Sequence, residues 1–257
     1  MTVLAFNELI NYLGDPGYHE CFSFDGITWK ALPSLLGNHC AYPYGIRSHY
    51  TDLGWWVGAM SENCNQGLYG NFSSELLTPD NDWIELPDGS PFGEYYPFGI
   101  CTLPLNSTHI FFSGGYVFDT TDNYLNTTWT LNLENLEWTA WPPMLSSRDG
   151  HGCLVTADNE VMIAGRWNGD DLDVQIFNPV SMEWRREGEL PPGIGRYKPI
   201  LLLWEQTPIL LESFTQNIWQ RDSTDLSWHL LNRTMGADFE GAFMKAIIVS
   251  EELYQCI

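Results

Sequence analysis

The sequence predicts an all-β fold made of small, repeated antiparallel sheets, and three features support this. Tryptophan recurs at intervals of roughly fifty residues, at Trp29, Trp83, Trp138, Trp184 and Trp228. A proline follows the tryptophan in most of these units, and two apolar runs precede it. No segment except 241–253, which we discount, shows the 3.6-residue period of an amphipathic helix.

Each repeat predicts a β-hairpin whose second strand begins at the tryptophan. In three units an Asn or Asp lies six residues before it, at Asn132, Asn178 and Asp222. Such a side chain can accept hydrogen bonds from the backbone that follows it and so open a turn. The outer strand then ends at a proline, because proline is confined to strand ends and edges. These prolines are Pro33, Pro87, Pro142 and Pro191.

Two inner strands precede each hairpin. In the unit with Trp184 they are the apolar runs 152–156 and 160–165. Runs that are apolar on both faces suit strands packed between neighbouring layers. We therefore expect four strands per repeat, in units near 1–35, 36–90, 91–145, 146–193 and 194–235 of a single domain covering 1–257.

Four-stranded units of about fifty residues, each with an aromatic wedge, are typical of a β-propeller. The first unit supplies only three strands, and 236–257 contains the spare apolar run 243–249. We expect this run to close the first blade, which gives five blades and removes the exposed sheet edges. A fragment of a six-bladed ring is the alternative.

Short motifs mark the units between about residues 95 and 195 most clearly. They are Arg148-Asp-Gly-His151, the double glycine Gly114-Gly115 with its weaker counterpart Ala164-Gly165, and Phe177-Asn178 ahead of Trp184. In these motifs the chain resembles the kelch-repeat family, within the galactose oxidase central-domain superfamily. The resemblance covers almost the whole chain and implies a propeller of kelch type, with Gly114, Gly115 and Gly165 as structural repeat residues.

The charge of the chain excludes some partners. It has 33 acidic and 11 basic residues and a net charge of -22. Because a surface of this sign repels nucleic acid and anionic membranes, neither is an expected partner. No segment approaches the roughly 20 apolar residues that cross a bilayer, so we expect no membrane insertion.

Cysteines and glycosylation sequons favour an extracellular or secreted, disulfide-bonded glycoprotein, although this chain shows no leader. The sequons are at Asn71, Asn106, Asn126 and Asn232, which we place in loops or at strand ends. Of the 6 cysteines, Cys21 and Cys40 flank one hairpin and are the preferred disulfide pair. Cys101 and Cys153 share a register in adjacent units, which predicts neighbouring positions near the axis. We interpret these two as core thiols.

Catalytic signals are weak. The chain has no G-x-S-x-G, H-E-x-x-H or Walker motif. The histidines are scattered over separate units, and 23–29 only approximates the Asp-box turn of sialidases. The acidic loop 168–173 lacks the spacing of an EF-hand, so we interpret it as solvated. We expect no metal and no cofactor.

Three arginines occupy equivalent places, each between the tryptophan of one unit and the first strand of the next: Arg47, Arg148 and Arg196. The resemblance implies a partly structural arginine that binds backbone carbonyls. The alternative is a cationic collar that recognises a carboxylate-bearing loop or an acidic glycan.

The sequence thus predicts a non-enzymatic extracellular binding scaffold. Its loops between strands two and three and between blades present a surface to a protein or glycan ligand. The alternatives are a propeller enzyme of the galactose oxidase or sialidase type and an intracellular kelch adaptor.

Overall fold

The fold is all-β. The computed structural model describes residues 3–6, 21–24, 28–34, 36, 39–40, 47–61, 71–80, 82–87, 90–92, 97, 99–117, 123–167, 172–194, 199–212, 215 and 217–234. These ranges hold strands and turns and no helix. Accordingly, none of the described segments is a helix of the length and apolarity that crossing a membrane requires.

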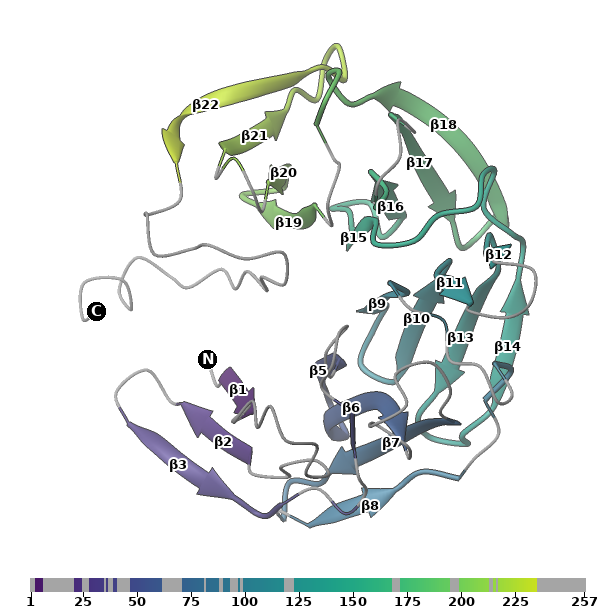
Figure 1. The fold of residues 1–257 in the computed structure, drawn as a ribbon, viewed down its shortest axis with the longest axis vertical. Helices are drawn as coiled ribbons and strands as arrows, with labels where there is room; N and C mark the ends of the chain where they lie inside the picture. Colours follow the sequence, from purple (N-terminus) through teal and green to yellow (C-terminus); the bar gives the residue numbers. More distant parts are fainter. Residues whose placement is uncertain are drawn as a thin grey trace.

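The described strands form five larger antiparallel sheets, numbered here as blades in chain order, and one separate two-stranded hairpin (Figure 1). Blade 1 has β1 (Val3–Phe6), β2 (Cys21–Phe24) and β3 (Trp29–Leu32). Blade 2 has β4 (His39–Cys40), β5 (Arg47–Thr51), β6 (Gly54–Ser61), β7 (Asn71–Leu77) and β8 (Trp83–Glu85). Blade 3 has β9 (Cys101–Pro104), β10 (His109–Ser113), β13 (Thr128–Asn132) and β14 (Trp138–Trp141). Blade 4 has β15 (Gly152–Val155), β16 (Val161–Ala164), β17 (Asp173–Asn178) and β18 (Glu183–Glu189). Blade 5 has β19 (Ile200–Trp204), β20 (Thr207–Leu211), β21 (Asn217–Arg221) and β22 (Trp228–Thr234). Separately, a short hairpin of β11 (Tyr116–Val117) and β12 (Asn123–Tyr124) extends from blade 3.

The blades follow one another around a common centre. The strands of blades 3, 4 and 5 pair in chain order, and Figure 1 shows β9, β15 and β19 near the centre and β14, β18 and β22 at the rim. This arrangement confirms the predicted all-β propeller with four-stranded blades. The segment 236–257, which we expected to close blade 1, lies outside the described residues. Closure at five blades and the six-bladed alternative therefore stay predictions.

Blade 2 departs from the expected four strands. Its strand β6 is long, and it pairs with β5 over Gly54–Gly58 and with β4 over Met60–Ser61. Because β5 is shorter than β6, the far end of β6 would otherwise present unpaired backbone groups on that side. The short strand β4 satisfies them, a feature that the repeat pattern did not predict.

The turns before the tryptophans have the predicted side-chain chemistry. The Oδ1 atom of Asn132 accepts from the backbone N–H of Glu134 at 2.8 Å. Asn178 Oδ1 accepts from Val180 N at 2.8 Å. Asp222 Oδ1 likewise accepts from Thr224 N at 2.7 Å, so all three Asx side chains open their turns as expected.

Apolar clusters fill the interfaces between neighbouring blades. Between blades 2 and 3 the cluster includes Phe112, with Trp138 packed against it at a ring distance of 4.7 Å. Between blades 3 and 4 it includes Phe111 and Phe177, and between blades 4 and 5 it includes Trp228. Since Phe111 and Phe112 are adjacent in β10, their side chains point to opposite faces and bury that strand on both sides.

Two indoles also form hydrogen bonds from one blade to the preceding one. The Nε1 atom of Trp83 donates to the carbonyl oxygen of Pro33 at 2.8 Å. Trp184 Nε1 donates to the carbonyl oxygen of Pro142 at the same distance. In both cases the acceptor is the proline that follows the outer strand of the previous blade, so the tryptophan and proline of the repeat act together. The side chain of Trp29 lies outside the described residues.

Candidate binding face

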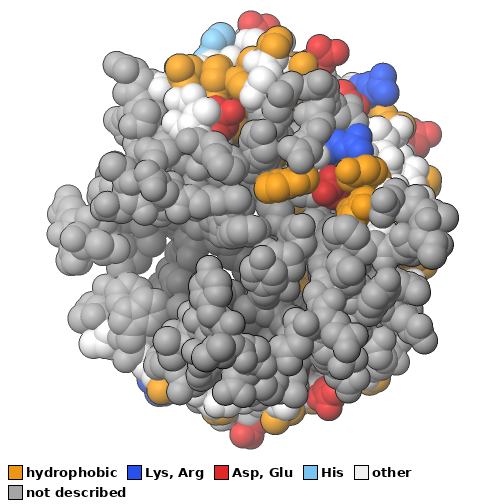
Figure 2. Space-filling view, in the orientation of Figure 1, with side chains coloured by type: hydrophobic (Ala, Val, Ile, Leu, Met, Phe, Trp, Pro, Cys, Tyr) orange, Lys and Arg blue, Asp and Glu red, His pale blue; other side chains and the backbone are white. Residues whose placement is uncertain are grey.

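One end of the ring carries the loops that join second to third strands and the links between blades. We call this end the loop face and define it by residues 114–117 and 123–127 of blade 3, the link 142–151, and residues 165–167 of blade 4. The opposite end carries the tight turns within each blade. Over blade 4, basic, acidic and apolar side chains lie next to one another in the space-filling view (Figure 2).

Arg148 lies inside the loop face. Its side chain is fully buried and forms an ion pair with Asp173. Its Nη1 and Nε atoms donate to the carbonyl oxygen of Gly165 at 3.3 Å and to Ser146 Oγ at 3.2 Å. Arg186 reaches the second oxygen of Asp173 at 3.2 Å. The guanidinium of Arg148 thus holds the loop to blade 4, which is the structural role that the resemblance implies.

The other two arginines of the predicted collar are less defined. Arg47 begins β5, but its side chain lies outside the described residues. Arg196 falls between described ranges. Their role in binding therefore stays a prediction.

The glycines of the repeat allow the link to approach blade 3. Gly114 has a φ of 63°, and a Cβ atom there would lie 2.3 Å from the carbonyl oxygen of Arg148. Gly115 and Gly165 have φ values of 105° and 78°. Beside them, Ser113 Oγ and His151 Nε2 are 2.8 Å apart and buried. Only glycine meets both the backbone conformation and the close contact at position 114.

On the loop face, the exposed Tyr124 contacts the half-buried Arg166. The guanidinium carbon of Arg166 lies 4.3 Å from the ring centroid of Tyr124, a cation–π contact. Tyr124 is 42% exposed, and Tyr116 packs against it at a ring distance of 4.8 Å. Within the described residues, Nε of Arg166 has no hydrogen-bond partner. That Nε atom is buried, so the pair offers a partner the Tyr124 ring and a cation that the ring positions.

The buried link positions this pair. Arg148 N donates to the carbonyl oxygen of Leu125, next to Tyr124, at 2.9 Å. Trp167 N, next to Arg166, donates to the carbonyl oxygen of Asp149 at 2.8 Å. The link thus fixes the backbone beside both Tyr124 and Arg166.

A disulfide joins Cys101 of β9 to Cys153 of β15, with 6.3 Å between the Cα atoms. The predicted proximity of these two residues is confirmed, but their interpretation as core thiols was wrong. The two strands belong to neighbouring sheets with no ladder between them, so the bond joins blades 3 and 4 covalently. Cys21 and Cys40 lie in the separate strands β2 and β4, and their side chains are outside the described residues. Their pairing stays a prediction.

The sequons occupy different settings. Asn106 is exposed in the turn between β9 and β10, where its Oδ1 accepts from Thr108 N at 2.9 Å. Asn126 is exposed, and its Nδ2 donates to the carbonyl oxygen of Met144 at 3.3 Å. Asn71 begins β7, whereas Asn232 lies inside β22 and not in a loop. Asn106 and Asn126 are thus the sequons with a described, exposed side chain.

Within the described residues, two sets of acidic side chains that offer oxygen ligands are engaged in the fold. Asp173, at the end of the predicted solvated loop, pairs with Arg148, and residues 168–171 lie outside the described ranges. The ligand atoms of Asp222, Asp225 and His229 lie within 4.8 Å of one another in the last hairpin turn. Each of these carboxylates accepts hydrogen bonds from its own turn, which lower their pKa values.

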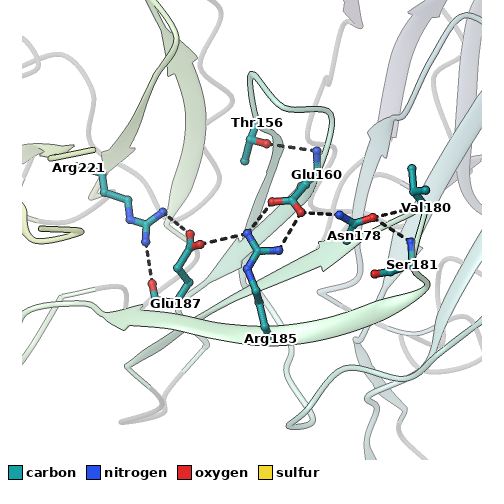
Figure 3. Close-up of polar contacts among 8 residues, drawn as sticks. All are labelled: Thr156, Glu160, Asn178, Val180, Ser181, Arg185, Glu187 and Arg221. Carbon is teal, nitrogen blue, oxygen red and sulfur yellow. Dashed lines mark hydrogen bonds and ion pairs between the residues drawn. The ribbon is translucent and has the colours of Figure 1, made fainter. Parts of the chain in front are cut away.

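A charged network ties the rim of blade 4 to blade 5 (Figure 3). Arg185 binds Glu160 through two hydrogen bonds of 2.8 and 2.6 Å and lies 3.0 Å from Glu187. Arg221 of blade 5 reaches Glu187 Oε2 at 3.0 Å and the Glu187 carbonyl oxygen at 2.7 Å. The Arg185 guanidinium holds the pKa of Glu160 below its usual range. Glu187 thus joins blade 4 to blade 5 through its carboxylate and its backbone carbonyl.

Part of this chain is similar in sequence to known kelch-like proteins. Kelch-like protein 23 of Mus musculus is 31% identical over 136 residues, which is 50% of this chain and 23% of that protein. Kelch-like protein 23 of Homo sapiens is 30% identical over the same length. This similarity confirms the kelch resemblance. No family model matches the chain. The matched region spans less than a quarter of these curated relatives' length.

The contact between Tyr124 and Arg166 was not predicted from the sequence. Comparison of equivalent arginines between units selected the buried Arg148 instead. The available signal was that Arg166 directly follows Ala164-Gly165, at the start of a loop between second and third strands. Its contact with Tyr124 joins loops of two different blades, which no pattern within one repeat reveals.

Proposed function

We propose that the chain is a protein-binding scaffold whose loop face recognises a carboxylate on its partner through Arg166 and Tyr124. Similarity to kelch-like proteins supports the scaffold, and the Tyr124–Arg166 pair supports the site. Arginine and tyrosine are enriched among residues that dominate binding energy. Arginine binds carboxylates through parallel N–H bonds, which stacking on an aromatic ring leaves available.

The observation that carries this proposal is the position of the Arg166 guanidinium, whose carbon lies 4.3 Å from the centroid of the exposed Tyr124 ring. The net charge of -22 repels a strongly acidic partner at long range. The proposed ligand is therefore a segment with a single carboxylate among neutral or basic residues. An acidic glycan offers the same group and is the second class of ligand that we propose.

Selection with a phage-displayed library of 12-residue peptides tests the site. Enriched peptides are measured by fluorescence anisotropy with the intact protein and with Arg166→Ala, for which we expect about tenfold or weaker binding. Arg185→Ala removes an equal charge from the rim and is the matched control. A glycan array is the parallel arm. Peptides that bind Arg166→Ala as well as the unchanged protein would refute the proposed site.

We also propose an extracellular or secreted location. The Cys101–Cys153 disulfide and the exposed Asn106 support it, because disulfides persist in oxidising compartments. Mass spectrometry of the native protein, with alkylation before reduction, gives glycan occupancy and the number of free thiols. Six free thiols with every sequon unmodified would instead favour the intracellular adaptor.

A further inference from the structure

The disulfide, the buried link and the Tyr124–Arg166 pair occupy one continuous part of blades 3 and 4. Cys153 follows the link by two residues, since β15 begins at Gly152. Cys101 pairs in register with Ser113 of β10, and Ser113 contacts His151 of the link at 2.8 Å. The covalent bond and this hydrogen bond therefore cross the same blade boundary side by side.

The link makes backbone contacts to both sides of the boundary. Gly115 N donates to the carbonyl oxygen of Arg148 at 2.7 Å, and Gly150 N donates to that of Gly99 at 2.7 Å. The bonds at Leu125 and Trp167 described above then connect the link to Tyr124 and Arg166. The link thus reaches the loop 123–127 through two backbone hydrogen bonds, since Met144 N also donates to the carbonyl oxygen of Asn126 at 2.8 Å, and it reaches residues 165–167 through one.

We propose that the Cys101–Cys153 disulfide is a redox-sensitive latch that holds the link 142–151 against both binding loops, so that its reduction weakens ligand binding at the Tyr124–Arg166 pair. This inference rests on the proposed function, because it concerns regulation of the same site. Its physical basis is that no backbone ladder joins β9 to β15. Without the covalent bond, these first strands are held across the boundary by side-chain packing and isolated hydrogen bonds, which open at lower free energy than a sheet.

Both cysteines are partly exposed, so a small thiol reaches them. A dithiol reductant attacks one sulfur to give a mixed disulfide, and its second thiol then displaces the other cysteine. The protein gains two electrons and two protons as two thiols, while the reductant leaves as its cyclic disulfide. Oxidation reverses the step.

Hydrogen exchange with mass spectrometry tests the latch without any ligand. We compare the oxidised protein, the protein reduced with dithiothreitol, and Cys101→Ser/Cys153→Ser, which keeps Cys21, Cys40, Cys64 and Cys256. We expect several-fold faster exchange at 123–127, 144–153 and 165–167 in the reduced protein and in the variant. Residues 156–160 at the opposite end of blade 4 keep their rate and serve as the internal control.

Binding of a peptide selected on the oxidised protein tests the coupling. We expect affinity to fall about fivefold or more on reduction and in the variant, and reductant to change the variant no further. Unchanged exchange in the loops, exchange that rises throughout the chain, or faster loop exchange with unchanged affinity would each overturn the proposal. If no peptide is selected at all, the proposed function fails, whereas the exchange result still decides whether the disulfide holds the loop face.

Discussion

The indole of Trp184 is hydrogen-bonded to the carbonyl oxygen of Pro142, 42 residues earlier and in the preceding blade. Trp83 makes the same contact with Pro33 at a separation of 50 residues. The two residues that recur most clearly in the sequence are therefore donor and acceptor across successive blade boundaries. A directional bond is added to the apolar packing that each indole provides.

We expect Trp184→Phe to destabilise the protein by about 1–2 kcal/mol, since it keeps an aromatic ring but removes the donor. The loss stays in this range because Pro142 O still accepts from Thr128 Oγ1 at 2.8 Å. Urea unfolding measures the change. Trp204→Phe is the control, because Trp204 is 41% exposed and its indole is absent from the buried clusters. Equal effects at the two positions would argue against a role for the hydrogen bond.

Met182→Gly is expected to stabilise the fold by about 1 kcal/mol. Met182 has a φ of 59°, a conformation that costs a bulky residue about 1–2 kcal/mol, and its side chain is 37% exposed. Leu136 has the equivalent φ of 61° but packs against the cluster between blades 2 and 3. Leu136→Gly therefore loses packing and gains no stability. The midpoint of thermal unfolding should be higher for Met182→Gly than for the unchanged protein. For Leu136→Gly it should be the same or lower.

Gly114→Ala should cost about 3 kcal/mol or more, because it combines an unfavourable φ with a clash against backbone. Gly193→Ala is the control that introduces the unfavourable φ without a clash. Gly193 has a φ of 85°, and a Cβ there meets no atom within 4 Å. This control should cost about 1 kcal/mol in the same unfolding assay. Similar losses for both variants would mean that the approach of Arg148 O to Gly114 is unimportant.

Acid should weaken the ion pair between Glu160 and Arg185 on the rim of blade 4. Because Arg185 lowers the folded-state pKa of Glu160, the ion pair stabilises the protein above the unfolded pKa of about 4.3. That contribution is lost as pH falls through the lower folded value. The pair is partly exposed, so we expect about 0.5–1 kcal/mol, measured as the stability difference between pH 6 and pH 3. Glu160→Gln should show a correspondingly smaller difference, and an identical pH profile would contradict this assignment.

Local rules explain which parts of the fold were predictable. The Asx side chains of Asn132, Asn178 and Asp222 bond to backbone two residues away, so their turns are visible in the sequence. Strand β4 was not, since its place depends on the length of β6, with which it pairs across many intervening residues. The residues of the candidate binding face also differ in how far the sequence predicts them. Arg148 stands out by its repeat position, whereas the Tyr124–Arg166 pair depends on how two loops meet.

The sequence by itself determined the repeating unit: four strands, an Asx turn, a tryptophan and a proline. These features act within one blade or through burial that recurs in every blade, so their period is recorded in the chain. Only the tertiary structure decided that Cys101 and Cys153 are bonded and that Arg166 stacks on Tyr124. Such contacts join different blades, and their distances are set by how the sheets pack around the axis.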